Sequence, residues 1–163
     1  MRKLFLVIIC VCFIFSLVHA GDFAYVGVKK CKMCHKGEKK GNVFEKWEKG
    51  PHAKAFETLK KDGSDKKAEC LGCHVTAFNK GGYKVDDADA AKFAGVQCEE
   101  CHGPGSAYKK MSIMKDKKKS LENGLIEPNE ALCKKCHNKK SPNFKGFDYK
   151  KYLEKIDHAY TKK

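Results

Sequence analysis

Cys31-Lys32-Met33-Cys34-His35 is the first of four Cys-x-x-Cys-His pentapeptides on which the fold of this chain depends. The others are Cys70-Leu71-Gly72-Cys73-His74, Cys98-Glu99-Glu100-Cys101-His102 and Cys133-Lys134-Lys135-Cys136-His137. Two residues between the thiols let both sulfur atoms reach the two vinyl carbons of one haem, and the adjoining histidine then lies beneath the iron as its proximal ligand. The four motifs therefore predict four covalently bound haem c groups.

Other uses of paired cysteines compete with haem attachment. Cys-x-x-Cys units build zinc sites and redox dithiols, and an exported chain can use cysteines for disulfides. None of these requires a histidine directly after the second cysteine in four cases out of four. The motifs also use every cysteine outside the N-terminal apolar run, which holds Cys10 and Cys12. This complete usage favours haem.

The first twenty residues have the form of a secretory signal peptide. Arg2 and Lys3 precede an apolar run over residues 4–18, and small residues at Val18 and Ala20 suit cleavage after Ala20. The run is short for a membrane span, which needs about 20 apolar residues. We therefore expect one tetrahaem domain over residues 21–163, exported to the periplasm or beyond and without stable membrane insertion.

The charge is strongly basic, with 34 Lys and Arg against 20 Asp and Glu and a net charge of +14. Every basic residue after position 20 is lysine. Nucleic-acid binding is disfavoured, because we expect the chain to be exported and it has no arginine after position 20 for bidentate contacts. A lysine-rich surface instead suits transient docking to acidic redox partners.

The segments between the motifs predict a mainly α fold in one compact domain, with short helices and loops packed around the haems. Few apolar side chains are available, so the macrocycles supply much of the interior. Helices are expected over 42–47, 52–60, 106–122, 130–137 and 148–157. Turns are expected at 63–65 and 81–82, and residues 83–85 are the one candidate strand.

Counting axial ligands shows that the haems differ. Beyond the four motif histidines His35, His74, His102 and His137, only His52 and His158 remain after position 20. At most two haems can therefore have two histidine ligands within one chain. Met111 and Met114 lie three residues apart on an expected helix face, where either could ligate an iron or simply pack. A lysine or the Gly21 amine could also ligate, and an iron without a sixth ligand would bind small molecules such as nitric oxide.

Several segments outside the motifs resemble one known family. They are Lys29-Lys30-Cys31, Trp47, the run from Pro51-His52-Ala53 to Leu59-Lys60, Cys70-Leu71-Gly72-Cys73-His74-Val75, Lys80-Gly81-Gly82-Tyr83, Gly95-Val96-Gln97-Cys98, Cys101-His102-Gly103-Pro104-Gly105, Phe147-Asp148 and Ile156-Asp157-His158-Ala159-Tyr160. Together they resemble the tetrahaem cytochrome c-554 family of ammonia-oxidising bacteria over nearly the whole chain after position 20.

The resemblance implies specific ligands. His52 would be the distal ligand opposite His102, and His158 the one opposite His137, while the haem on His74 would be five-coordinate. The family's distal histidine for the first haem falls where this chain has residues 108–114, which contain no histidine. Met111 or Met114 would then take its place, or that iron too would be open.

The function expected is non-enzymatic electron transfer in the periplasm. The family members carry electrons, and the namesake receives them from hydroxylamine oxidoreductase, so the resemblance implies an oxidoreductase donor and a cytochrome or quinone-linked acceptor. The alternative is a small oxidoreductase that reduces nitric oxide or a related nitrogen species at the open haem.

Overall fold

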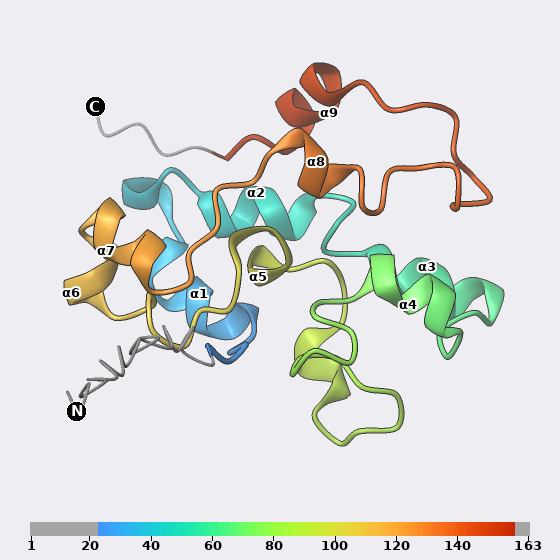
Figure 1. The fold of residues 1–163 in the computed structure, drawn as a ribbon, viewed down its shortest axis with the longest axis horizontal. Helices are drawn as coiled ribbons and strands as arrows, with labels where there is room; N and C mark the ends of the chain where they lie inside the picture. The colour runs from blue at the N-terminus through green and yellow to red at the C-terminus, as the bar shows by residue number, and fades with distance from the viewer. Residues whose placement is uncertain (1–22, 159–163) are drawn as a thin grey trace, which may run out of the picture.

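The computed structural model describes residues 23–158, so the expected signal peptide and its cleavage site lie outside the described residues. The described part is helical, as predicted, and no residue in it forms a strand. Its elements in chain order are α1 (Val28–His35), η1 (Glu38–Lys40), α2 (Val43–Lys49), α3 (Ala55–Asp62), α4 (Ala68–His74), η2 (Ala90–Phe93), α5 (Cys98–His102), α6 (Met111–Met114), α7 (Lys117–Glu122), α8 (Glu130–Cys133) and α9 (Tyr149–Ile156) (Figure 1).

Each motif forms one helical turn. Three motifs lie wholly within α1, α4 and α5. The fourth begins at Cys133, the last residue of α8, and continues as a turn in which the His137 N–H donates to the Cys133 carbonyl at 3.0 Å. Residues i, i+3 and i+4 share one face of a helix. Both thiols and the imidazole of every motif therefore lie on the same side, as attachment of a single haem requires.

The helix expected over 106–122 is instead two short helices, α6 and α7. Asp116 breaks the run, because its side chain accepts from the Lys119 N–H at 3.1 Å and caps α7. The Ser120 hydroxyl donates to the Ile113 carbonyl at 3.0 Å and folds α7 back on α6. The predicted stop after Glu122 is present, since Gly124 has a φ of 95°.

The candidate strand over 83–85 is wrong. The Tyr83 N–H donates to the Thr76 carbonyl at 2.9 Å, across the turn that includes Gly81 and Gly82. That carbonyl belongs to a tight loop, so no ladder of hydrogen bonds can extend from it. A single antiparallel bridge between Val75 and Ala94 lies nearby. Tyr83 serves the core instead, with its ring 5.2 Å from that of Phe56.

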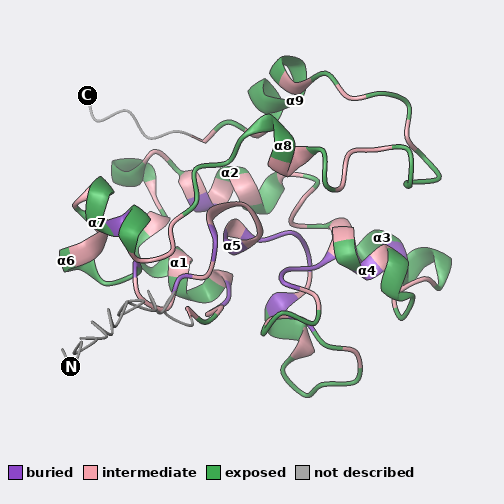
Figure 2. Cartoon of the chain, in the orientation of Figure 1, coloured by how far each residue is buried: buried purple, intermediate pink, exposed green. Residues whose placement is uncertain are grey.

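The hydrophobic core of the described residues is small and lies under α3, α4 and η2, while most of the surrounding helix surface is exposed (Figure 2). It consists of Phe56, Leu59, Leu71, Val75, Tyr83 and Phe93. The longest helices have eight residues, and isolated helices of that length are marginal in water. The rest of the fold therefore depends on contacts around the motifs.

The motifs are spread along the longest dimension of the molecule. In Figure 1, α1 lies at one end beside α6 and α7, whereas α3 and α4 form the opposite end. Helix α5 is central, and α8 and α9 lie above it in this view. The first and second motifs thus occupy the two ends.

Candidate haem-binding sites

The eight described cysteines are all free thiols. Residues 23–158 contain no cluster of three or more His, Cys, Asp or Glu side chains arranged to hold a metal ion. Burial raises the pKa of Cys101 to about 11 and that of Cys136 to about 12. A redox dithiol needs a lowered thiol pKa, which neither of these two thiols has.

Cysteines from different motifs lie close together in three pairs. These are Cys31 with Cys98, Cys73 with Cys136, and Cys101 with Cys133. The members of each pair are near enough for their side chains to influence each other electrostatically. The first motif therefore adjoins the third, the third adjoins the fourth, and the fourth adjoins the second.

Backbone carbonyls orient two of the motif histidines. The His74 Nδ1–H donates to the Ala55 carbonyl at 2.7 Å, at the start of α3. The His102 Nδ1–H donates to the Ile126 carbonyl at 3.3 Å, and the Ile126 N–H donates back to the His102 carbonyl at 2.9 Å. Binding at Nδ1 fixes the ring and leaves Nε2 for a metal. Both histidines are thus prepared as axial ligands.

Gly103 makes the His102 arrangement possible. Its φ is +77°, and a Cβ at this position would collide with the Gly124 carbonyl. Without a side chain, the turn after the third motif lets residues 124–126 approach the imidazole. The glycine is therefore a requirement of the site rather than of the loop alone.

The imidazoles are in the protonation state that binds iron. Burial lowers the pKa of His35, His52, His102 and His137 below its ordinary value. Burial disfavours the charged form of histidine. At neutral pH these rings are therefore uncharged and have a free lone pair.

The two additional histidines lie opposite motif histidines, but in pairs that differ from those the resemblance implied. The His52 ring centre is 6.0 Å from that of His137, and the His158 ring centre is 6.1 Å from that of His102. Two imidazoles on opposite faces of one metal have centres roughly 6 Å apart, because each metal–nitrogen bond is about 2 Å. Each of these spacings fits a bis-histidine iron.

The placement of each ring follows from how its histidine is held. The Val96 N–H donates to the His52 carbonyl at 2.9 Å, and the Trp47 indole N–H donates to the Val96 carbonyl at 2.9 Å. These bonds fix the turn between α2 and α3, so that the His52 ring faces His137. The His158 Nδ1–H donates to the Ile156 carbonyl at 2.8 Å beyond the end of α9, which orients that ring at the His102 site.

A cleft of about 590 Å³, including its open mouth, lies at the third motif. It is lined by both attachment cysteines, Cys98 and Cys101, and by both members of the His102–His158 pair, with Trp47 among its apolar walls. A second hollow, of about 500 Å³, borders Cys136 and His137. The lining of the first cleft thus supplies the two thiols and the two imidazoles that a haem on the third motif requires.

Aromatic rings surround the fourth motif, a feature that sequence reasoning missed. The Phe147 ring stacks on His137 with centres 4.7 Å apart and an interplanar angle of 14°. Tyr152 of α9 lies 5.1 Å from Phe147 and 6.0 Å from His137. The shared helix face of Tyr149, Tyr152 and Ile156 was the available signal, since it marks α9 as packing against something.

Glu99 is the other site residue that was missed. It stands between the cysteines of the third motif and is 1% exposed. Its carboxylate accepts from the Val26 N–H at 2.9 and 3.1 Å, from the Gly27 N–H at 2.7 Å and from the Gly105 N–H at 2.7 Å. One side chain thus joins the segment before α1 to the third motif and the turn that follows it.

Glu100 and Gln97 extend the same framework. The Glu100 carboxylate accepts from the Ala77 N–H at 2.7 Å, which ties the third motif to the loop after the second. The Gln97 side chain accepts from the Val28 N–H at 2.8 Å and donates to the carbonyls of Lys92 and Ala94. Polar side chains next to the cysteines therefore set the relative positions of three motifs.

Met111 and Met114 both lie on α6, as the sequence suggested. Met111 is 63% exposed, and Met114 is half-buried. Ligation of the His35 iron by either one stays a prediction.

We expect this prediction to be decided by Met111→Leu and Met114→Leu variants. If one thioether ligates the His35 iron, only that variant loses the near-infrared iron–thioether charge-transfer band of the oxidised protein. Met33→Leu is the matched control and should retain the band. A wild-type spectrum without the band would contradict the prediction.

Helical Cys-x-x-Cys-His turns, half-buried neutral histidines and a cleft lined by two attachment thiols and two imidazoles define a multihaem c-type cytochrome. Residues 30–103 match the family model described as cytochrome c554 and c-prime. The chain is also 32% identical, over 172 aligned residues, to cytochrome c-554 of Nitrosomonas europaea, an alignment that covers 87% of this chain and 71% of the relative. The chain belongs to the cytochrome c554 family.

The fold agrees with that assignment. The structure resembles the solved reduced state of cytochrome c554 from Nitrosomonas europaea, with a TM-score of 0.58 and 29% identity over 78% of this chain and 72% of the other. Membership implies that the protein carries c-type haems and transfers electrons. Within residues 23–158, no helix has the length and apolar character needed to cross a bilayer.

Proposed function

We propose that this cytochrome is an exported electron carrier in which four haems form one continuous conducting array. The observation that carries the proposal is the sequence of motif contacts, in which the first motif meets the third, the third meets the fourth, and the fourth meets the second. Bound haem supplies a one-electron ferric/ferrous couple at each site. The order 1-3-4-2 makes the haems on His35 and His74 the two ends.

The protein's own residues give the four sites different properties. We propose His137 with His52 as one axial pair and His102 with His158 as another, supported by ring spacings of 6.0 and 6.1 Å. His74 supplies one ligand to its iron, and His35 is joined by Met111 or Met114. Axial ligand identity is one of the main determinants of haem potential, so the four potentials should be unequal.

Export and partner choice follow from the sequence. The basic start, apolar run and small residues before position 21 support cleavage after Ala20 and a periplasmic location. The excess of lysine supports transient complexes with an acidic oxidoreductase donor and with a cytochrome or quinone-linked acceptor. Nothing in the described residues favours nitric oxide reduction at the His74 haem, so only electron transfer is proposed.

The proposal predicts four haems that all titrate reversibly. Intact-mass measurement of the purified protein should show the mass of four haem c groups on a chain that begins at Gly21. A spectroelectrochemical titration should require more than one one-electron component and should return to the starting spectrum on reoxidation. Fewer than four haems, or an array that cannot be reduced and reoxidised in the respiratory range, would contradict the proposal.

A further inference from the structure

Charge is distributed unevenly along the array. The end that carries the first motif, residues 28–40 together with 109–127, has twelve lysines against four acidic residues. The end that carries the second motif, residues 55–92, has seven lysines against seven acidic residues. The two ends of the array therefore differ in net charge, with +8 at one and zero at the other.

The basic segments come together in space. Helices α6 and α7 lie beside α1 at one end of the molecule (Figure 1). The Ala24 N–H donates to the Ser106 hydroxyl at 2.8 Å, and the Ser106 N–H donates to the Ala24 carbonyl at 3.1 Å, which joins the chain just before each segment. Tyr108 also lies close enough to Cys31 to be influenced by its charge. The two segments thus form one surface around the first motif, here called the first-motif face.

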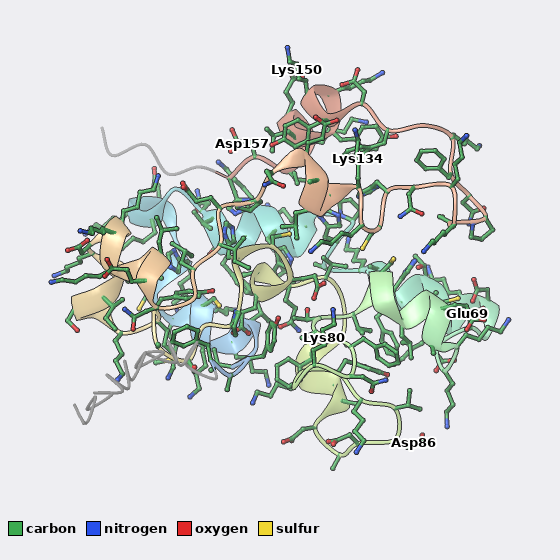
Figure 3. The ribbon with its side chains drawn as sticks, viewed as in Figure 1. Glu69, Lys80, Asp86, Lys134, Lys150 and Asp157 are labelled. Atoms are coloured by element: carbon green, nitrogen blue, oxygen red, sulfur yellow. The ribbon has the colours of Figure 1, made fainter. Side chains whose placement is uncertain are left out.

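Few of these lysines are neutralised locally. All twelve are exposed: Lys29, Lys30, Lys32, Lys36, Lys39, Lys40, Lys109, Lys110, Lys115, Lys117, Lys118 and Lys119. Within residues 23–158, ion pairs involve just two of them, Lys117 with Glu127 at 2.6 Å and Lys119 with Asp116 at 3.6 Å. At the opposite end both signs are mixed, with Glu69, Lys80 and Asp86 exposed on one lobe (Figure 3), and Lys66 pairs with Asp86 at 2.8 Å.

The first-motif face also carries an exposed apolar side chain. Met33 is 70% exposed. In helical register it lies opposite the side that presents Cys31, Cys34 and His35, so a haem attached to the thiols would leave it uncovered. Methionine is enriched at protein interfaces relative to the rest of the surface.

We propose that the first-motif face is the docking surface for an acidic redox protein, which exchanges electrons with the array at the His35 haem. The inference rests on the electron-carrier function proposed above. One electron leaves the reduced centre of the partner and converts one ferric haem to ferrous, or moves in reverse, and no bond or proton is transferred. The array is thereby polarised, with a protein-docking end at His35 and a charge-neutral end at His74.

The region of the fourth motif is a weaker candidate for this role. Residues 129–157 hold eight lysines against four acidic residues, and Lys134 is paired with Glu130 at 2.7 Å. Tyr152 and Leu153 are exposed there. In the order of contacts, however, the fourth motif is internal, between the third and the second, so a partner docked there would not enter at an end of the array.

Charge reversal at each end tests the proposal on the full-length holoprotein. The test variant is Lys30→Glu with Lys110→Glu, two exposed lysines of the first-motif face without ion pairs among the described residues. The matched control is Lys61→Glu with Lys84→Glu, which makes the same change in net charge at the second-motif end. Stopped-flow mixing with reduced cytochrome b5, an acidic haem protein used as the probe, measures the second-order rate constant at low and at near-physiological ionic strength.

The expected result is a loss of about tenfold or more in the rate constant at low ionic strength for the test variant, and less than about twofold for the control. The difference should shrink as salt screens the charges. Both variants should be reduced at the wild-type rate by a neutral hydroquinone and should keep wild-type haem content. Equal losses in the two variants would overturn the docking assignment while leaving reversible electron transfer, and hence the proposed function, intact.

A membrane surface is the other possible occupant of a basic face. Cosedimentation with vesicles containing anionic phospholipid distinguishes it. If the test variant lost vesicle binding but kept its rate with cytochrome b5, the face would be a lipid contact and the proposal would be wrong.

Discussion

Replacing Glu99 by alanine is expected to lower the free energy of unfolding by about 3–6 kcal/mol. This is the largest effect on stability that we expect from a single buried side chain of this protein. The change leaves the N–H groups of Val26, Gly27 and Gly105 without their acceptor. A buried donor that loses its partner costs about 1–3 kcal/mol, and three donors are affected together. The expected loss is therefore a substantial part of the stability of a small domain.

Denaturation with guanidinium chloride, followed by far-ultraviolet circular dichroism and by the Soret band, measures the effect. Glu69→Ala is the matched control, because Glu69 also lies beside the first cysteine of a motif but is exposed. Its effect should stay within about 0.5 kcal/mol. A Glu99→Ala variant destabilised by less than about 1 kcal/mol would show that water replaces the carboxylate at no cost.

Glu99→Gln separates charge from hydrogen bonding. The amide keeps one oxygen acceptor but turns an NH₂ group toward N–H donors, so we expect it to be destabilising as well. Both variants remove a negative charge beside the third attachment site. Since a nearby carboxylate favours the more positive ferric state, the potential of the His102 haem should rise in both.

Glu99 shows why part of this site could not be predicted from the sequence. The spacing within each motif is a local property, because cysteines at i and i+3 and histidine at i+4 share one helix face whatever surrounds them. The attachment residues were therefore accessible to sequence reasoning. The shared helix face does not depend on which two residues stand between the cysteines. No sequence pattern therefore indicated that Glu99 is buried. Its role exists only because the segment around Val26 folds back onto it.

The secondary structure shows the same division between local and distant causes. Asp148 caps α9 and Asn129 caps α8. Helix α9 formed where expected, whereas the helix expected over 130–137 ends at Cys133 and continues as a turn. The helix over 106–122 failed because Asp116 offers its side chain to the backbone of the next turn, which competes with continuing the helix. The candidate strand at Tyr83 did not form because the backbone hydrogen bonds of Tyr83 are made with the tight loop that precedes it, at Thr76 and Asn79.

The placement of the two additional histidine rings has a tertiary cause. His52 and His158 could be identified as the only spare histidines, but which motif each one faces depends on how α2, α3 and α9 pack. The hydrogen bonds of Val96 with His52 and with Trp47 span over 40 residues of sequence. No local pattern encodes such a contact.

Removing either spare histidine is expected to convert one low-spin haem to high spin. Electron paramagnetic resonance of the oxidised protein should show one additional high-spin iron in His52→Ala and one in His158→Ala, because each iron loses its sixth ligand. Loss of a histidine ligand should also shift the potential of that haem, which a redox titration detects. A variant with unchanged spin counts would show that its histidine is not an axial ligand.

Removing one haem then decides the partners. In a Cys133→Ala, Cys136→Ala background the fourth haem is not attached, which intact-mass measurement confirms by a total of three. If His52 ligates the iron on His137, His52→Ala should add no high-spin iron in this background, whereas His158→Ala should still add one at the His102 haem. The pairing implied by family resemblance predicts the reverse. Because each variant is the control for the other, loss of stability alone cannot produce the pattern, and the ring spacings of 6.0 and 6.1 Å favour the first outcome.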